Sequence, residues 1–174
     1  RGPALTSTFI AIFGLIIGSF LNVVIARLPE GRSLLGRSAC PECREQIRAG
    51  DNIPLVSFAL LGGRCRRCRQ PISWRYPLVE VATAAAMVAV YARFGLTPPF
   101  GAAGALMAAL IAVTVIDLEH QVIPRLITLP GIAVGLIVSP LTGLTQGRDA
   151  IIGGLVCGGV LLGVVLATAW MSLV

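Results

Sequence analysis

Long hydrophobic stretches with few or no charged residues alternate with polar segments along most of this chain. The first stretch covers residues 4–26, which is long enough, at 1.5 Å per helical residue, to cross a hydrocarbon layer of about 30 Å. Further stretches of the same character cover residues 78–94, 100–116, 122–141 and 150–174. The pattern predicts an all-α protein, a polytopic membrane helical bundle with about five spans.

The composition supports a membrane protein rather than a soluble domain. Hydrophobic residues make up 56% of the 174 residues and charged residues only 13%, which is more apolar than a soluble core of this size requires. Gly14, Gly18 and Ser19 share one face of the first stretch and favour close packing against another helix. Asn22, near the end of the same stretch, predicts an interhelical hydrogen bond, with a part in a functional site as the alternative.

One polar segment, residues 27–77, carries most of the charge. It contains ten of the fourteen arginines and four acidic residues, so its balance of +6 equals that of the whole chain. Such arginine-rich loops stay on the cytoplasmic side, which places the N-terminus outside. We therefore expect a first span at residues 1–26, a cytoplasmic head at 27–77, and spans two to five at 78–174. Few aromatic residues accompany the arginines, so we expect contact with membrane lipid and no binding of nucleic acid.

The head contains two C-x-x-C pairs with 21 residues between them. Cys40 and Cys43 form the first pair, and Cys65 and Cys68 form the second. Two such pairs can complete a tetrahedral zinc site. Two disulfides or catalytic redox thiols are the alternatives, but a reducing cytoplasm favours thiolates and a metal over disulfides. Four sulfur ligands close the coordination shell, so we expect a structural zinc that holds together a head too small to form its own core.

Asp117 follows directly on the third hydrophobic stretch. An ionisable residue at such a depth is a functional candidate, and both the negative end of a helix and partial burial favour a protonated carboxyl. An interfacial carboxylate in water or a cap of the next helix is the alternative. We expect Glu80 in the first turn of the second span, or alternatively at the functional site. His120, the single histidine, is expected to be an interfacial polar residue rather than a ligand.

Several short motifs occur in one order along the chain. They are GSFLNVV at 18–24, RLP at 27–29, ACPxC at 39–43, NIPLVS at 52–57, GxCxxC at 63–68, ISxRYPLVE at 72–80 and IDxxHQxIP at 116–124. In this order the motifs resemble those of the type IV prepilin peptidase family, the membrane aspartic proteases of bacterial pilus and type II secretion systems.

The resemblance implies an aspartic endopeptidase that cleaves the leader peptide of type IV prepilins or pseudopilins at the cytoplasmic face of the bacterial inner membrane. Asp117 matches the first of the two aspartates to which cleavage is ascribed in the family. The second belongs to a G-x-G-D-x-K motif that does not occur in these 174 residues. We therefore expect that aspartate to lie in a missing C-terminal part, and the chain alone to be inactive.

The resemblance also implies a possible second activity, because many family members methylate the new N-terminus with S-adenosylmethionine. That compound would then be a cofactor beside the structural zinc. The chain departs from the family at Arg125, where an aspartate is common. A non-catalytic, zinc-headed membrane scaffold of the secretion or pilus machinery is the alternative function. A further hypothesis assigns Arg75 to an acidic group of the substrate, with a role in fixing the membrane topology as the alternative.

Overall fold

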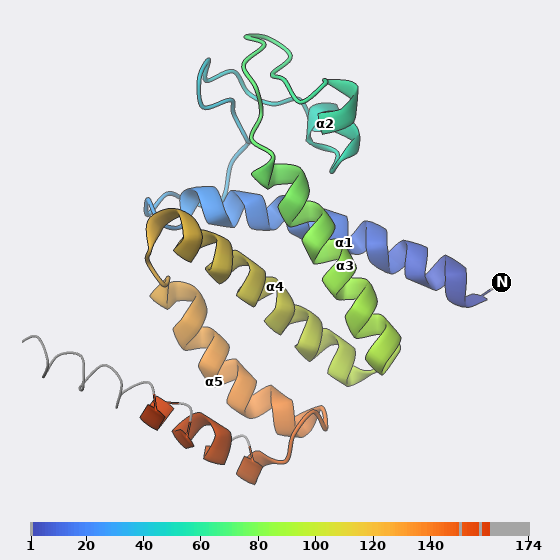
Figure 1. The fold of residues 1–174 in the computed structure, drawn as a ribbon, viewed down its shortest axis with the longest axis vertical. Coiled ribbons are helices and arrows are strands. Elements are labelled where there is room, and N and C mark those ends of the chain that lie inside the picture. The colour runs from blue at the N-terminus through green and yellow to red at the C-terminus, as the bar shows by residue number, and fades with distance from the viewer. Residues whose placement is uncertain (1, 150, 157, 161–174) are drawn as a thin grey trace, which may run out of the picture. The chain divides into compact units, whose positions relative to one another are not determined.

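The computed structural model describes residues 2–149, 151–156 and 158–160. Within these residues the protein is helical and contains no strand. The elements, in order, are α1 (Gly2–Arg27), η1 (Ala49–Asn52), α2 (Val56–Leu60), α3 (Arg75–Phe94), α4 (Pro98–His120) and α5 (Arg125–Leu141), as Figure 1 shows. The chain divides into two compact units, Arg1–Gly131 and Ile132–Val174. The first unit contains α1 to α4 and the start of α5.

Three helices, α1, α3 and α4, are long and apolar enough to cross a membrane. They confirm the prediction of a polytopic, all-α membrane protein. The fourth predicted span corresponds to α5, an apolar helix of 17 residues. The second unit contains the rest of α5 and, after a turn, further helical residues. The fifth predicted span, residues 150–174, lies largely outside the described residues.

The ends of α4 follow from local sequence. The helix begins with Pro98 and Pro99 at its first positions, where a proline costs nothing because the first N–H groups of a helix have no partner inside it. It ends because Gln121 adopts a left-handed conformation, with φ of 52°, and donates its N–H to the Asp117 carbonyl at 2.8 Å. The helix therefore extends about one turn beyond the C-terminal end of the predicted stretch and includes Asp117 in its last turn.

Helix α3 begins at Arg75, three residues before the predicted stretch 78–94. This shift moves Glu80 into the second turn, and the first turn contains no acidic residue. The prediction that Glu80 lies in the first turn, beside the positive end of the helix dipole, is therefore wrong.

Two glycines bring α1 and α3 into backbone contact. A Cβ atom added to Gly14 would lie 2.6 Å from the Ala84 Cα, and one added to Gly18 would lie 2.6 Å from the Glu80 Cα. Both distances are far below van der Waals contact, so a larger residue at either position would push the helices apart. The prediction that small residues on one face of α1 pack closely against another span is confirmed.

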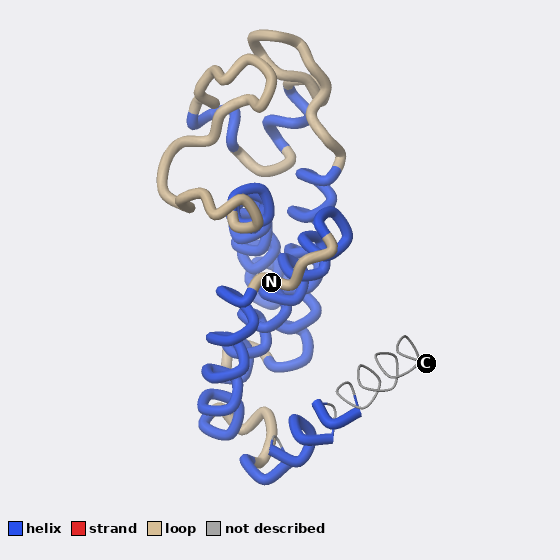
Figure 2. The backbone as a smooth tube through the Cα atoms, turned by 90° about the vertical axis from the view of Figure 1, so that its left-hand side faces the viewer, coloured by secondary structure: helices blue, strands red, loops and turns tan. Residues whose placement is uncertain are grey.

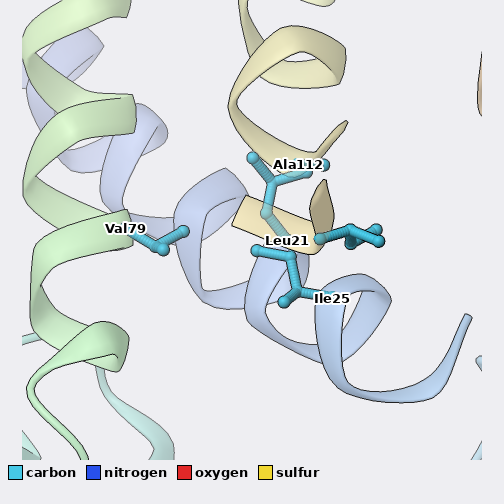
Figure 3. Packing of buried hydrophobic residues seen from close by; sticks show 5 residues of the cluster. Leu21, Ile25, Val79 and Ala112 are labelled. Carbon is cyan, nitrogen blue, oxygen red and sulfur yellow. The ribbon is translucent and has the colours of Figure 1, made fainter. Parts of the chain in front are cut away.

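A buried cluster joins α1, α3 and α4 (Figure 3). Its members are Leu21, Ile25, Val79, Ala112 and Ile116. Ile25 and Ile116 are fully buried and lie near the C-terminal ends of α1 and α4, whereas Val79 lies near the start of α3. The cluster therefore holds these three helix ends together. The head between α1 and α3, which consists mostly of loop (Figure 2), leaves the bundle at this end.

Candidate functional site

The four cysteines of the head form a cluster that could hold a metal ion. Their Sγ atoms all lie within 4.8 Å of one another, and those of Cys40 and Cys68 are 3.8 Å apart. A tetrahedral site with Zn–S bonds of about 2.3 Å places its sulfurs about 3.8 Å from one another, so the spacing fits zinc. All four thiols are free, Cys40 is buried and the other three are half-buried. The cluster therefore has the number, kind and spacing of ligands that a closed zinc site requires.

The two C-x-x-C pairs lie on backbone loops of the same design. In each loop the first cysteine donates its N–H to the carbonyl five residues later, and its own carbonyl accepts from the N–H four residues later. The bonds, at 2.7–3.1 Å, are Cys40 to Glu45, Arg44 to Cys40 and Ile47 to Ser38 in the first loop, and Cys65 to Gln70, Arg69 to Cys65 and Ile72 to Gly63 in the second. Arg44 and Arg69 have φ of 55° and 60°, a conformation that glycine adopts most easily. The repeated loop presents two thiols from each side of the cluster.

The protein environment gives the thiols of the second loop different acidities. The backbone N–H groups of Cys68 and Arg67 lower the pKa of Cys65 to about 7. The N–H of Gln70 acts in the same direction on Cys68, but burial and hydrogen bonds with the other thiols outweigh it and raise the pKa of Cys68 to about 11. A metal binds the thiolate form, so metal binding at this cluster would release protons.

Arg27, the last residue of α1, holds the loop that leads into the head. Its guanidinium donates to four backbone carbonyls at 3.0–3.3 Å, those of Ser33, Leu34, Leu35 and Arg37. The sequence indicated a topological role for the arginines of the head, but not this contact. The four hydrogen bonds attach the start of the head to the end of α1.

Glu80 attaches the head to α3. Its side chain is only 7% exposed, and its Oε2 atom accepts a hydrogen bond from the Leu55 N–H at 2.8 Å. Ser19 of α1 also interacts with this carboxyl group. Leu55 has φ of 57°, a strained conformation that costs of the order of 1–3 kcal/mol. The buried carboxylate therefore holds a strained turn of the head against two helices.

Asn22 forms the interhelical hydrogen bond that its position predicts. Its Nδ2 atom donates to the Tyr76 carbonyl at 3.1 Å, which connects α1 to the first turn of α3. The side chain is 3% exposed, and its Oδ1 atom has no hydrogen-bond partner among the described residues.

A groove of about 660 Å³ lies between α1 and the head. Residues of α1 line one side of it, and two walls come from the head, the first from Leu34 and residues 36–38 and the second from Ile47 and residues 52–54. Arg27 binds carbonyls of the first wall, and Glu80 binds the residue that follows the second. The groove is therefore bounded by segments that are fixed to the helices.

Asp117 lies in the last turn of α4, directly after the buried Ile116. Its side chain is exposed within the described part of the chain, so the partial burial expected from the sequence is not found. One helical residue corresponds to a rotation of about 100°, which turns Asp117 out of the face that Ile116 buries. Among the described residues, neither Asp117 nor His120 joins the cysteine cluster.

Glu119, in the same turn as Asp117, forms an ion pair with Arg75 at the start of α3. The Arg75 Nη1 atom lies 2.5 Å from the Glu119 Oε2 atom, and the two side chains are 20% and 35% exposed. His120 is partly exposed, with its Nε2 atom 4.0 Å from the same carboxylate oxygen. The sequence did not indicate the Arg75–Glu119 pair, because only the fold shows that these two helix ends meet.

These features define a polytopic membrane protein with a four-thiol head and an accessible carboxylate at the end of a membrane helix. Residues 12–94 match the family model described as the bacterial peptidase A24 N-terminal domain, and residues 104–172 match that of the type IV leader peptidase family. The chain belongs to the type IV leader peptidase family.

Relatives named prepilin leader peptidase/N-methyltransferase occur in several bacteria. The chain is 42% identical to the one from Myxococcus xanthus, over 89% of this chain and 46% of the relative. It is 41% identical to the one from Aeromonas hydrophila, over 88% and 61%, and 40% identical to the one from Pseudomonas aeruginosa, over 82% and 57%. The chain thus spans about half the length of these relatives. No solved structure matches it.

Proposed function

We propose that this chain carries one catalytic carboxylate of a membrane aspartic endopeptidase that removes the leader peptide of type IV prepilins or pseudopilins. The observation that carries the proposal is the exposed Asp117 at the end of a membrane-length helix, in a chain that belongs to this family. An exposed carboxylate in that position is open to a peptide that approaches from the membrane surface. A carboxylate with a purely structural role would instead be expected to form an ion pair within the protein.

In the proposed reaction Asp117 acts together with a second aspartate outside these 174 residues. Two carboxyl groups that lie close together share a proton, because they cannot both ionise easily. One acts as the base and takes a proton from water as the water oxygen attacks the scissile carbonyl carbon. The other acts as the acid and gives its proton to the amide nitrogen as the C–N bond breaks. On this proposal the chain alone is inactive.

The proposal places Asp117 and the head at the cytoplasmic face of the bacterial inner membrane, with the N-terminus outside. The excess of arginine in residues 27–77 supports this orientation, and contact of those arginines with membrane lipid is part of the proposal. It also divides the chain into a first span at 1–26, the head at 27–77, and further spans at 78–174.

The proposal assigns the metal a structural role. Cys40, Cys43, Cys65 and Cys68 would hold zinc and thereby fix the fold of the head, which has little buried apolar surface of its own. The four cysteine sulfurs would fill all four ligand positions of the zinc, which leaves no position at which the metal could bind substrate. Methylation of the new N-terminus with S-adenosylmethionine is a second proposed activity, and it rests on the name that the relatives carry.

The test uses the full-length protein that contains this chain, in detergent or lipid, with a prepilin as substrate. The product mass shows cleavage, and an added methyl mass shows methylation. Asp117→Asn should reduce cleavage by at least about 100-fold, because general acid–base catalysis contributes about 10²–10⁴-fold. Asp149→Asn, a control at another exposed aspartate, should cleave normally. Cleavage retained by Asp117→Asn would contradict the proposal, and a folded wild-type protein that never cleaves would favour the non-catalytic scaffold.

A further inference from the structure

Arg75 and Glu119 each lie at the unfavourable end of their own helix. Arg75 begins α3, where the helix dipole is positive, and Glu119 lies in the last turn of α4, where it is negative. Since the start of α3 meets the end of α4, each charge instead faces the favourable end of the neighbouring helix. In the ion pair, at 2.5 Å, each charge therefore interacts favourably with the dipole of the neighbouring helix and unfavourably with the dipole of its own helix.

Tyr76 holds the Arg75 side chain from the α3 side. The Arg75 guanidinium lies 4.9 Å from the centre of the Tyr76 ring, and the Tyr76 carbonyl in turn accepts a hydrogen bond from Asn22 of α1. Contacts thus run from α1 through the first turn of α3 to Glu119. The side chain is only 20% exposed, and its buried Nε atom has no hydrogen-bond partner among the residues that the structure describes.

The same contacts determine which way Asp117 points. At about 100° per residue, Glu119 lies about 60° to one side of the buried Ile116, and Asp117 lies about 100° to the other side. Ile116 in the core and Glu119 on Arg75 therefore hold the last turn of α4 at two positions. A rotation of this turn that broke the ion pair would also move the Asp117 carboxylate.

We infer that Arg75 and Glu119 are positioning residues, which hold the last turn of α4 so that Asp117 points toward the substrate and its partner carboxylate. The inference rests on the proposed function. It assigns Arg75 to Glu119 of its own chain rather than to an acidic group of the substrate.

The pair is tested in the full-length protein by single variants and a charge swap. Arg75→Gln and Glu119→Gln should each reduce the kcat of prepilin cleavage by about 10- to 100-fold, because a misplacement of about 1 Å can cost about 100-fold. KM should change by less than about twofold, because neither residue binds the substrate. The swap, Arg75→Glu with Glu119→Arg, should restore kcat to within about fivefold of wild type, because it keeps the pair and places each charge at the favourable end of its own helix.

Arg93→Gln provides a matched control. Arg93 belongs to the same helix and also lies over a neighbouring aromatic ring, that of Phe94 at 5.3 Å, but it is at the far end of α3 from Asp117. The Arg93→Gln variant should cleave prepilin at the wild-type rate. If a neutral variant fails to fold, Arg75→Lys and Glu119→Asp preserve the charges, and each should give a kcat between those of the wild type and the neutral variants.

The outcomes separate this inference from the proposed function. Cleavage by Asp117→Asn in the same assay would contradict the proposed function. An inactive Asp117→Asn together with fully active Arg75→Gln would overturn the inference alone. A raised KM with unchanged kcat in Arg75→Gln would also overturn the inference, and it would assign Arg75 to the substrate. A charge swap that restores no activity would overturn the inference as well.

Discussion

The head and the helical bundle are stabilised in different ways. Bundle contacts are apolar and depend on shape, since Gly14 and Gly18 let α1 and α3 meet at the backbone and a buried cluster fills the space beside them. In the head, two hydrogen-bonded loops present a group of four thiols, and the ion pairs Arg66–Asp51 and Arg67–Glu45 link charged side chains of the head. The bundle is thus held by the fit of apolar side chains, whereas the head gathers four thiols that could hold a metal ion.

The largest expected effect is that of removing the metal. A strong chelator, or Cys40→Ser with Cys43→Ser, should unfold the head while the helical content of the membrane part remains, because structural zinc sites contribute about 10–16 kcal/mol of binding free energy. Limited proteolysis between residues 28 and 74 should speed up sharply as the zinc content falls. Cys157→Ser, at a cysteine outside the two pairs, is the control. A head that stays resistant to protease without metal would contradict this prediction and would show that the head, like the bundle, is stable without a metal.

A large residue on α1 tests the bundle in the opposite direction. Gly18→Leu should destabilise it by at least about 1–3 kcal/mol, because the new side chain would overlap the Glu80 backbone. A lower melting temperature with unchanged zinc content would show that the bundle can lose stability while the head stays folded. Gly101→Leu is the matched control, since a Cβ at Gly101 has nothing within 4 Å. Equal effects of the two variants would contradict the close helix contact.

Glu80 tests the connection between the two regions. Glu80→Ala should lower the free energy of unfolding by about 1–3 kcal/mol, because it leaves the Leu55 N–H without its acceptor. Glu80→Gln retains an acceptor oxygen and should cost less. Hydrogen exchange at the Leu55 amide measures this directly, and it should be faster in the alanine variant. Unchanged exchange would show that the head is held without Glu80.

The smallest effect is expected at the Asp51–Arg66 pair on the surface of the head. The hydrogen bond from Arg66 holds the pKa of Asp51 below its usual value of 3.8, so the pair stabilises the folded head above that pH and loses its effect only as the pH falls through the lower value. Asp51→Asn should lower the melting temperature slightly, and by the same amount at pH 7 and pH 5. Glu42→Gln should have no effect. A difference that disappears by pH 5 would contradict the lowered pKa.

Features that residue types and spacing within a segment indicate were predictable from the sequence, even where the contacting residue in another segment was not. Helix-forming apolar stretches, the small-residue face of α1, and the gathering of the thiols by two C-x-x-C turns all belong to this group. The Asn22 hydrogen bond was predictable as well, because a lone polar side chain in an apolar helix needs an interhelical partner.

Features that depend on where separate segments meet were not predictable. The contacts of Arg27 with four carbonyls, of Glu80 with Leu55, and of Arg75 with Glu119 each join residues whose proximity only the fold establishes. The exposure of Asp117 was mispredicted for a related reason. Hydrophobic sequence shows that a helix enters the membrane, but the burial of one residue depends on its angle from Ile116, which faces the core.

A metal bound by the thiol cluster would also affect how α1 and α3 come together during folding. Residues 28–74 join α1 to α3, and an unconstrained loop of that length makes the meeting of its two ends entropically costly. A metal shared by Cys40 and Cys68 would bypass the residues between them, so that the path from α1 to α3 becomes much shorter. The head would then act as a staple that presents α3 to α1 before Gly14 and Gly18 make their contacts. A small polar domain would in this way guide the assembly of the membrane bundle beside it.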